Sequence, residues 1–307
     1  SRVTLRRALA ALEEGNLLQT GSKSRMIKSP KARKAKKTIS FVASGHIRIA
    51  LPAWNRLWEK LKQDSEQEGY KICLHLYSKI KPLANDELED SDFIIYAGSE
   101  EDLKGDHCWL VDDPRVIGVY EGASSLLRNI VAVDNYAIGE MAAEAIIASG
   151  YRNPLFIGWD TGFDAFLKRY AGFKGTIQKH DISFNAEWIK GKSIGEFMRK
   201  FLMDSDRFIC DDFDSVFVYS DEGISVIYDI IANKYKVPEE YGIVTVSGSH
   251  QGLINYPPID SVSHGTAHVA FSLFPLMDDM KKGKAKAENH ILVPPSMHEG
   301  LTLKRSI

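Results

Sequence analysis

The stretch Ile130-Val131-Ala132-Val133-Asp134-Asn135-Tyr136-Ala137-Ile138-Gly139 decides the fold of this 307-residue chain. Its first four residues form a short apolar run that is typical of a buried strand. Beyond the Asp-Asn pair, apolar residues recur at helical spacing, at Ile138, Met141, Ala142, Ala145 and Ile146. A buried strand followed directly by an amphipathic helix is the unit from which parallel sheets are built.

The same alternation of strand and helix patterns continues from Thr38 to the end of the chain. The expected strands are Ile39–Val42, Ile72–Tyr77, Phe93–Tyr96, Val116–Tyr120, Ile130–Val133, Leu155–Ile157, Val216–Tyr219, Ile243–Val246 and Ile291–Val293. Other helical faces are Leu51, Trp54, Trp58 and Leu61; then Ile224, Ile227, Tyr228 and Ile231; then Val269, Leu273, Leu276, Met277 and Met280. About 270 residues are long for one doubly wound sheet. The sequence therefore predicts an α/β fold with two doubly wound parallel-sheet lobes.

Charge is distributed unevenly along the chain. Residues 1–37 hold eleven Lys and Arg against two acidic residues, a net charge of +9, whereas the remainder holds 28 basic and 39 acidic side chains, a net charge of −11. A basic head on an acidic body favours an anionic partner at the N-terminus, with nucleic acid first and an acidic membrane surface second. A solvated basic tail is the open alternative.

Composition also limits the compartment and the chemistry. No apolar run approaches the roughly 18 residues of a membrane-spanning helix, and the N-terminus is basic and polar, so we expect a cytoplasmic protein without a membrane partner. The three cysteines, Cys73, Cys108 and Cys210, are too far apart for a Cys-x-x-Cys site or a disulfide framework. We expect them to be buried small apolar residues.

The first thirty residues combine a helical pattern with a hairpin pattern. Leu5, Leu9 and Leu12 recur at helical spacing, and short strands are expected on either side of the polar turn 21–24. This part of the chain resembles the recognition helix and wing of GntR-type repressors. Because the first two helices of that family do not precede it here, we interpret residues 1–30 as a partial winged helix-turn-helix, followed by a basic linker at 31–38. The resemblance implies that operator DNA is contacted by Ser1, Arg2, Thr4, Arg6, Gly21 and Lys23, although Arg2 and Arg6 could also lie on a solvated helix face.

Several later segments resemble the effector domain of LacI/GalR-type repressors, which has the type I periplasmic-binding-protein fold. They are 131–139 with the Gly150-Tyr151-Arg152 stretch, the R-x-x-G-F match at 169–173, the strand at 214–221, the approach at 238–246, Pro257-Pro258-Ile259 and 291–295. Together they cover 39–307. The resemblance implies an N-lobe of about 39–133 plus 264–289, a C-lobe of about 134–263 plus 290–307, and a homodimer. A GntR-like head on a LacI-like body is similar to arabinose-type repressors.

The sequence departs from the LacI pattern at three places. Ser247-Gly248-Ser249-His250 replaces the usual acidic residue after a strand, Gly300-Leu301-Thr302 replaces the closing Arg-x-Ser, and the region 79–92 is short. The first departure removes a carboxylate that often binds a sugar hydroxyl.

Candidate ligand-binding residues follow the expected strands. Ligands of open α/β sheets bind beyond the carboxyl ends of the strands, which in a two-lobed protein places the site in a cleft between the lobes. Carboxylates and Arg can pair with sugar hydroxyls, and aromatic rings can stack on sugar C–H faces. The candidates are Asp134, Arg169, Asp221, Ser249, Trp159, Phe163 and Trp54. Asp134 and Asp221 could instead cap helices, and Trp54 could belong to the core.

Motifs for catalysis, cofactor binding or metal binding are incomplete. Gly191-Lys192-Ser193 lacks the earlier glycine of a phosphate-binding loop, because Ala186 stands there. His264 and His268 have the spacing of a zinc pair, but Gly265 stands where a zinc protease has its base, so we expect a packed or surface pair. We therefore predict no enzyme activity, no cofactor and no metal.

These patterns together indicate a ligand-responsive bacterial transcriptional regulator. It would be a repressor whose operator binding is controlled by a sugar or sugar-like effector. A sugar-binding solute receptor without a DNA-binding role is the first alternative, and an enzyme built on a doubly wound sheet is the second.

Overall fold

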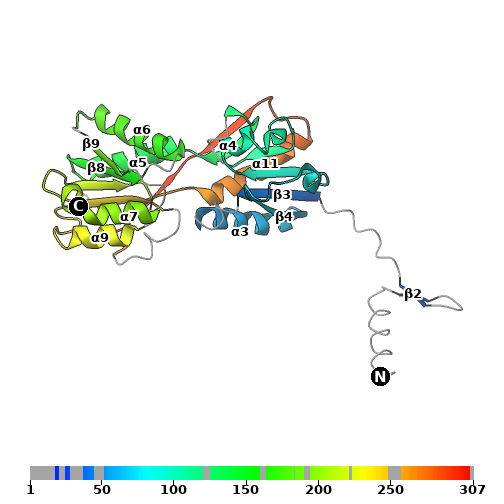
Figure 1. The fold of residues 1–307 in the computed structure, drawn as a ribbon, viewed down its shortest axis with the longest axis horizontal. Coiled ribbons are helices and arrows are strands. Elements are labelled where there is room, and N and C mark those ends of the chain that lie inside the picture. Colours follow the sequence, from blue (N-terminus) through cyan, green and yellow to red (C-terminus); the bar gives the residue numbers. More distant parts are fainter. Residues whose placement is uncertain are drawn as a thin grey trace, which may run out of the picture.

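The computed structural model describes the backbone at 18–20, 25–27, 37–44, 52–119, 125–159, 164–182, 184–189, 194–220, 223–247 and 257–304. Side chains are described in these ranges except at 18–20, 25–27, 52–56, 159, 185–189, 194, 208 and 266–267. The main body consists of two lobes placed end to end, each built around one sheet (Figure 1). The predicted α/β fold with two parallel-sheet lobes is confirmed.

The N-lobe contains a six-stranded parallel sheet in the order β13-β7-β6-β5-β3-β4. Its strands are β3 (Lys37–Ser44), β4 (Tyr70–Tyr77), β5 (Phe93–Ala97), β6 (Val116–Gly118), β7 (Asn129–Val133) and β13 (Asn289–Val293). Its helices are α3 (Pro52–Gln67), α4 (Glu100–Lys104) and α11 (Thr266–Lys281), with the 3-10 turns η1 (Asn85–Leu88) and η2 (Cys108–Leu110).

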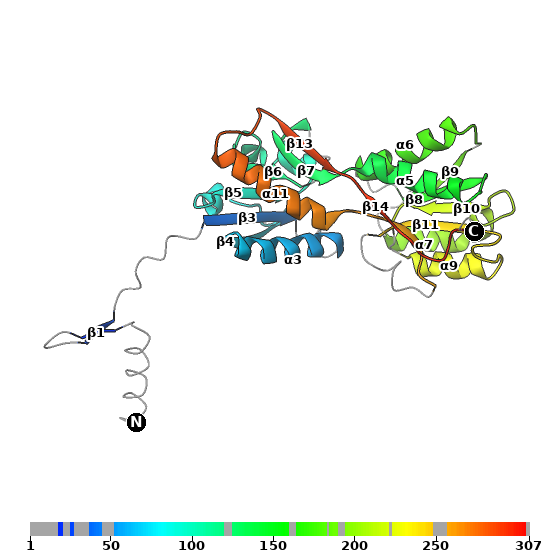
Figure 2. The ribbon, with the colours of Figure 1, turned by 180° about the vertical axis from the view of Figure 1, so that it is seen from behind.

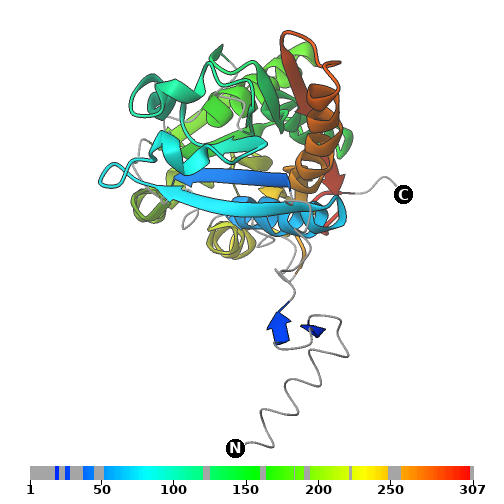
Figure 3. The same ribbon diagram turned by 90° about the vertical axis from the view of Figure 1, so that its right-hand side faces the viewer.

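Alternating side chains of the N-lobe strands fill two cores, one on each face of the sheet. Ile39 and Phe41 pack under α3 and α11, whereas Val42 faces the side that α4, η1 and η2 cover. Figure 3 shows α3, in blue, and α11, in orange, beside each other along the strands, and both pack on the same face of the sheet. The parallel strands are thus covered on both faces, as expected for apolar runs of this kind.

The C-lobe repeats this plan with a sheet of order β14-β12-β11-β10-β8-β9, in which only the β12–β14 pair is antiparallel among the described strands. Its strands are β8 (Pro154–Trp159), β9 (Asn185–Ile189), β10 (Ser215–Val218), β11 (Gly242–Ser247), β12 (Asp260–Ser263) and β14 (Ser296–His298). Its helices are α5 (Asn135–Ala148), α6 (Asp164–Lys179), α7 (Ile194–Met203), α8 (Ser205–Phe208) and α9 (Ile224–Ala232). Helices α5 and α6 cover one face, and α7 and α9 cover the other (Figures 1 and 2).

In the described part of the chain, three crossovers lead from an element of one lobe to an element of the other. We call them the first crossover (133–135, from β7 to α5), the second crossover (263–266, from β12 to α11) and the third crossover (293–296, from β13 to β14). Figure 2 shows the third crossover carrying the last part of the chain from one lobe to the other.

One predicted lobe boundary is wrong. We predicted that residues 290–307 belong to the C-lobe. Strand β13, however, pairs in parallel with β7 and belongs to the N-lobe. The passage falls at Pro294-Pro295. Proline has no backbone N–H to donate to a sheet, so two prolines in succession end the strand there.

The crossovers fix the directions of both sheets. Strand β7 ends at the first crossover, so the carboxyl ends of the N-lobe strands parallel to it point toward the C-lobe. Strand β12 ends at the second crossover, so the carboxyl ends of β11, β10, β8 and β9 point toward the N-lobe. The carboxyl edges of the two sheets therefore face each other.

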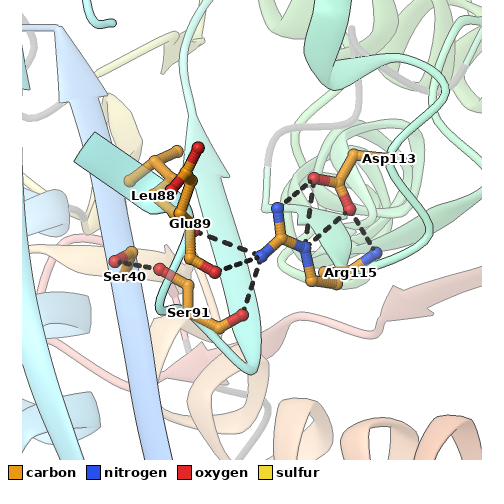
Figure 4. A network of polar contacts seen from close by, with 6 residues as sticks. All are labelled: Ser40, Leu88, Glu89, Ser91, Asp113 and Arg115. Carbon is orange, nitrogen blue, oxygen red and sulfur yellow. Dashed lines mark hydrogen bonds and ion pairs between the residues drawn. The ribbon is translucent and has the colours of Figure 1, made fainter. Parts of the chain in front are cut away.

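A polar network holds the opposite, amino edge of the N-lobe sheet. Arg115, just before β6, binds the Asp113 carboxylate through Nε and Nη2 and donates from Nη1 to the carbonyl oxygens of Leu88, Glu89 and Ser91 (Figure 4). The hydrogen bonds from Arg115 to Asp113, together with the Asp113 charge, raise the pKa of the Arg115 guanidinium. One cation thus ties three backbone carbonyls of the segment from the end of η1 to β5 to the start of β6.

At the N-terminus, β1 (Leu18–Thr20) and β2 (Arg25–Ile27) pair antiparallel, which confirms the predicted hairpin strands. The expected recognition helix lies outside the described residues. Among the described cysteines, Cys108 is exposed and Cys73 and Cys210 are half-buried, so the expectation that all three are buried is wrong. No helix in the described part of the chain is long and apolar enough to cross a bilayer.

Candidate functional site

Two glycines bring α5 and α6 into backbone contact beside the first crossover. A Cβ on Gly139 of α5 would lie 2.0 Å from the carbonyl oxygen of Arg169, and one on Gly172 of α6 would lie 2.1 Å from the carbonyl oxygen of Tyr136. Only glycine allows helices to approach this closely. The close crossing places Arg169, one turn before Phe173, over the start of α5.

The Arg169 side chain is 5% exposed and binds three parts of the protein. Its Nε donates to Asn135 Oδ1 at 3.0 Å, its Nη1 donates to the Tyr219 carbonyl oxygen at 3.0 Å, and its Nη2 lies 2.7 Å from His264 Nε2. The guanidinium carbon is also 5.0 Å from the centroid of the Tyr219 ring. The buried charge of Arg169 therefore forms hydrogen bonds to the first crossover, the end of β10 and the second crossover.

The contact with Arg169 defines the protonation of His264. A guanidinium has only donors, so Nε2 of His264 must accept the hydrogen bond. The imidazole is then neutral and carries its proton on Nδ1.

Asp134 occupies the first crossover and caps α5. Its Oδ1 accepts a hydrogen bond from the Ala137 backbone N–H at 2.9 Å, and its own N–H donates to the Val293 carbonyl oxygen at 3.0 Å. The capping alternative raised by the sequence is confirmed. Its ligand-binding role stays a prediction.

The other predicted ligand-binding side chains lie outside the described residues or side chains. For Trp54 and Trp159 the structure places the backbone, in α3 and at the end of β8. Nothing of Phe163, Asp221 or Ser249 is described, and the same holds for the predicted DNA contacts Ser1, Arg2, Thr4, Arg6, Gly21 and Lys23. Of the seven predicted ligand-binding residues, the structure describes the side chains of Asp134 and Arg169, and Arg169 binds Asn135, the neighbour of Asp134.

Three residues of this arrangement were not among the predicted site residues. Asn135 follows the capping Asp134, Tyr219 offers its carbonyl and ring, and His264 stands in the second crossover. The Asp-Asn pair at the end of an apolar strand was a usable signal for Asn135. His264 had no local signal, because its partner Arg169 is 95 residues away.

The N-lobe contributes a second buried polar cluster, at the carboxyl ends of β4 and β5. Tyr77 Oη donates to Asp102 Oδ2 at 2.8 Å and lies 3.2 Å from Tyr96 Oη, and the His107 ring packs edge-on against Tyr77 at 4.2 Å between centroids. Burial raises the pKa of both tyrosines. The tyrosine hydroxyls therefore stay protonated as donors at neutral pH.

We expect His107 to make the stability of the protein depend on pH. The side chain is 1% exposed, and burial lowers its pKa below 6.5 although Asp102 and Asp106 act in the opposite direction. Because unfolded histidine binds a proton near pH 6.5 and the folded one does not, stability is fully present above that pH and falls as the pH drops below it. Burial also lowers the pKa of His75, which adds to the same trend.

Urea denaturation at pH 7.5, 6.5 and 5.5 measures this effect. His107→Gln should flatten the loss of unfolding free energy between pH 7.5 and 5.5, whereas His298→Gln, on exposed β14, should leave it as in the wild type. Equal slopes for all three proteins would show that His107 does not carry the dependence.

Metal binding finds no support in the described residues, among which no group of three or more His, Cys, Asp or Glu side chains could hold an ion. His264 and His268, the pair with zinc spacing, do not share a site. His264 binds Arg169, and His268 is exposed on α11.

Solved structures resemble this chain over most of its length. A periplasmic binding protein/LacI transcriptional regulator from Alkaliphilus metalliredigens QYMF, complexed with D-xylulofuranose, is 20% identical with a TM-score of 0.66, covering 87% of this chain and 99% of that chain. A transcriptional regulator LacI from Bacillus cereus subsp. cytotoxis NVH 391-98 is 16% identical with a TM-score of 0.72, covering 89% and 100%. The Lac repressor dimer bound to operator and the anti-inducer ONPF is 15% identical with a TM-score of 0.72, covering 89% and 96%.

At these identities the likeness shows a shared fold. No curated protein matches the sequence. A family model for the periplasmic binding protein-like domain matches residues 143–303, which is more than half of the chain. The chain therefore belongs to the periplasmic-binding-protein-like domain family.

Proposed function

We propose that this protein is a transcriptional regulator whose DNA binding is controlled by a sugar or sugar-like molecule bound between its lobes. The observation that carries the proposal is the convergence on Arg169, where the first crossover, the second crossover and the end of β10 meet. Both sheets direct their carboxyl edges to this region, which is where ligands of parallel sheets bind. We expect binding without turnover, and no cofactor.

A polar ligand suits the chemistry of this region. Guanidinium N–H groups are planar and directional, which suits the paired oxygens of sugars and their derivatives, and Arg169 places a guanidinium where the crossovers meet. Asp134 and Asn135 place further polar atoms at the first crossover. Among the similar folds, one was solved with D-xylulofuranose and another is described as a cellobiose complex, which favours a carbohydrate effector for this chain.

DNA binding is proposed from the N-terminal part of the sequence. The net charge of +9 over residues 1–37 and the β1–β2 hairpin agree with a recognition helix and wing. A dimer would carry two such heads, and each pair of heads must match two operator half-sites at a fixed spacing. We take the protein to be a repressor. A ligand that favours one arrangement of the lobes would then change the spacing of the heads and release the operator. The usual coupling is about 1–3 kcal/mol.

The test uses the full-length protein and a duplex selected from a random library. Fluorescence anisotropy should show DNA binding that weakens steeply between 50 and 200 mM salt, because phosphate contacts release counterions. Titration with a panel of monosaccharides that includes D-xylulose should shift the DNA affinity by roughly tenfold for at least one of them. Absence of salt-dependent DNA binding in every condition would refute the regulator.

A solute-binding protein is the second candidate, because the matched family model describes a binding-protein domain and the described lobes would suffice for it. The same experiment separates the two functions. Sugar binding by calorimetry together with absence of DNA binding would support the solute-binding protein.

A further inference from the structure

The three crossovers lie against one another in the structure. The Asp134 backbone N–H of the first crossover donates to the Val293 carbonyl oxygen of the third at 3.0 Å. A Cβ on Gly265 of the second crossover would lie 3.3 Å from Val293 Cγ1 and 3.4 Å from the Pro294 carbonyl oxygen. The connections on which the lobes would turn thus form one compact bundle.

Arg169 ties two of these crossovers together from outside the bundle. It belongs to α6 of the C-lobe, yet it donates to the Asn135 side chain at the first crossover and to the His264 side chain at the second. Both contacts are charge-assisted, and the guanidinium and Asn135 are 5% exposed. Buried hydrogen bonds of this kind are about twice as strong as neutral ones and depend steeply on geometry.

Rotation of one lobe against the other changes the backbone angles of the crossovers. Such a rotation moves the His264 side chain relative to α6, because His264 lies within the second crossover. Asn135 is the first residue of α5 and stays with α6 through the close contact at Gly139 and Gly172. A planar guanidinium that Asn135 holds on one side cannot follow His264 when His264 moves away. The lobe arrangement and the position of Arg169 are therefore linked through these two acceptors.

We propose that Asn135 and His264 are positioning residues that clamp Arg169 across the first and second crossovers, and that this clamp sets the arrangement of the two lobes. The part of the inference that concerns ligand affinity rests on the proposed function. The clamp requires an acceptor at each position, an amide oxygen at 135 and a neutral imidazole nitrogen at 264.

The first arm of the test measures lobe arrangement without any ligand. The full chain would carry Cys73→Ser, Cys108→Ser and Cys210→Ser, with spin labels at Lys62→Cys on α3 and Asp229→Cys on α9. These two exposed positions lie on helices of different lobes (Figure 1). Double electron–electron resonance then gives the distribution of distances between the lobes.

His264→Ala should shift or broaden this distribution, because the clamp loses one acceptor. His264→Gln should restore it, since the Gln amide oxygen can accept from Arg169. His268→Ala, one helical turn further on the exposed side of α11, is the matched control and should leave the distribution unchanged. The same contrast is expected of Asn135→Ala and Asn135→Asp, which decides the question if a His264 variant does not fold.

An unchanged distribution in folded His264→Ala would overturn the clamp. So would equal broadening in His264→Ala and His264→Gln, because His264 would then act only through its shape.

The second arm uses calorimetry with a monosaccharide that the wild type binds. His264→Ala should weaken this affinity by about tenfold or more, and His264→Gln should stay within about twofold. Unchanged affinity in His264→Ala would overturn the link to binding. If the wild type binds no sugar, the proposed function fails, while the distance measurement still decides the clamp.

Discussion

Gly172→Ala is expected to lower the free energy of unfolding by about 3 kcal/mol. The new Cβ would lie 2.1 Å from the Tyr136 carbonyl oxygen and 3.1 Å from the Glu140 backbone nitrogen, and backbone atoms inside a packed helix pair cannot move aside cheaply. The helices must separate, which would also withdraw Arg169 from the crossovers. Urea denaturation followed by circular dichroism measures the loss.

Gly175→Ala in the same helix is the matched control. Its Cβ would meet only the Tyr136 hydroxyl, at 3.3 Å, which is the end of a side chain that can move. Alanine is also the better helix former by about 1 kcal/mol, so this variant should be as stable as the wild type or more so. Equal destabilisation by the two substitutions would contradict a contact between backbones at Gly172.

Asp260→Asn is expected to cost about 3 kcal/mol of unfolding free energy. The carboxylate is fully buried; its Oδ1 accepts from the Gly300 N–H at 3.0 Å, and its Oδ2 accepts from the N–H groups of Thr302 and Leu303 at 2.9 Å each. An amide keeps one oxygen and turns an NH2 group toward a backbone donor, so at least one buried N–H loses its acceptor.

Comparison of urea midpoints for Asp260→Asn and for Asp229→Asn, exposed on α9, isolates this effect. Only the first should move the midpoint. Equal urea midpoints for Asp260→Asn and Asp229→Asn would show that the C-terminal segment does not depend on the Asp260 carboxylate. The contact also explains the departure at Gly300-Leu301-Thr302, because a Cβ on Gly300 would lie 2.4 Å from the Asp260 backbone nitrogen.

The elements that the sequence predicted well are those whose signal is local. All nine expected strands have a counterpart, because apolar runs in a parallel sheet are covered on both faces. Strand β12 was missed because Asp260, Ser261 and Ser263 give it a polar pattern. Its buried carboxylate is satisfied by residues about 40 positions later, which no local pattern reveals.

The candidate site was likewise predictable only for residues that have a local sequence signal. Arg169 was singled out by its R-x-x-G-F context, and the structure places it at the crossovers with Asp134 nearby. The structure adds that Gly172 in this motif makes a helix contact and that the guanidinium binds protein groups on three sides. His264 could not be assigned, because its role arises only when the second crossover folds against α6.

The most direct test of a ligand site between the lobes is isothermal titration calorimetry of the full-length protein with a panel of monosaccharides, repeated for Arg169→Ala, Arg169→Lys and the exposed control Arg199→Ala on α7. Circular dichroism confirms that each variant is folded. We predict that at least one sugar binds the wild type and Arg199→Ala equally, and binds both Arg169 variants at least about tenfold more weakly, a loss of roughly 1.4 kcal/mol. Absence of binding by every sugar, or unchanged affinity in folded Arg169→Ala, would contradict the account.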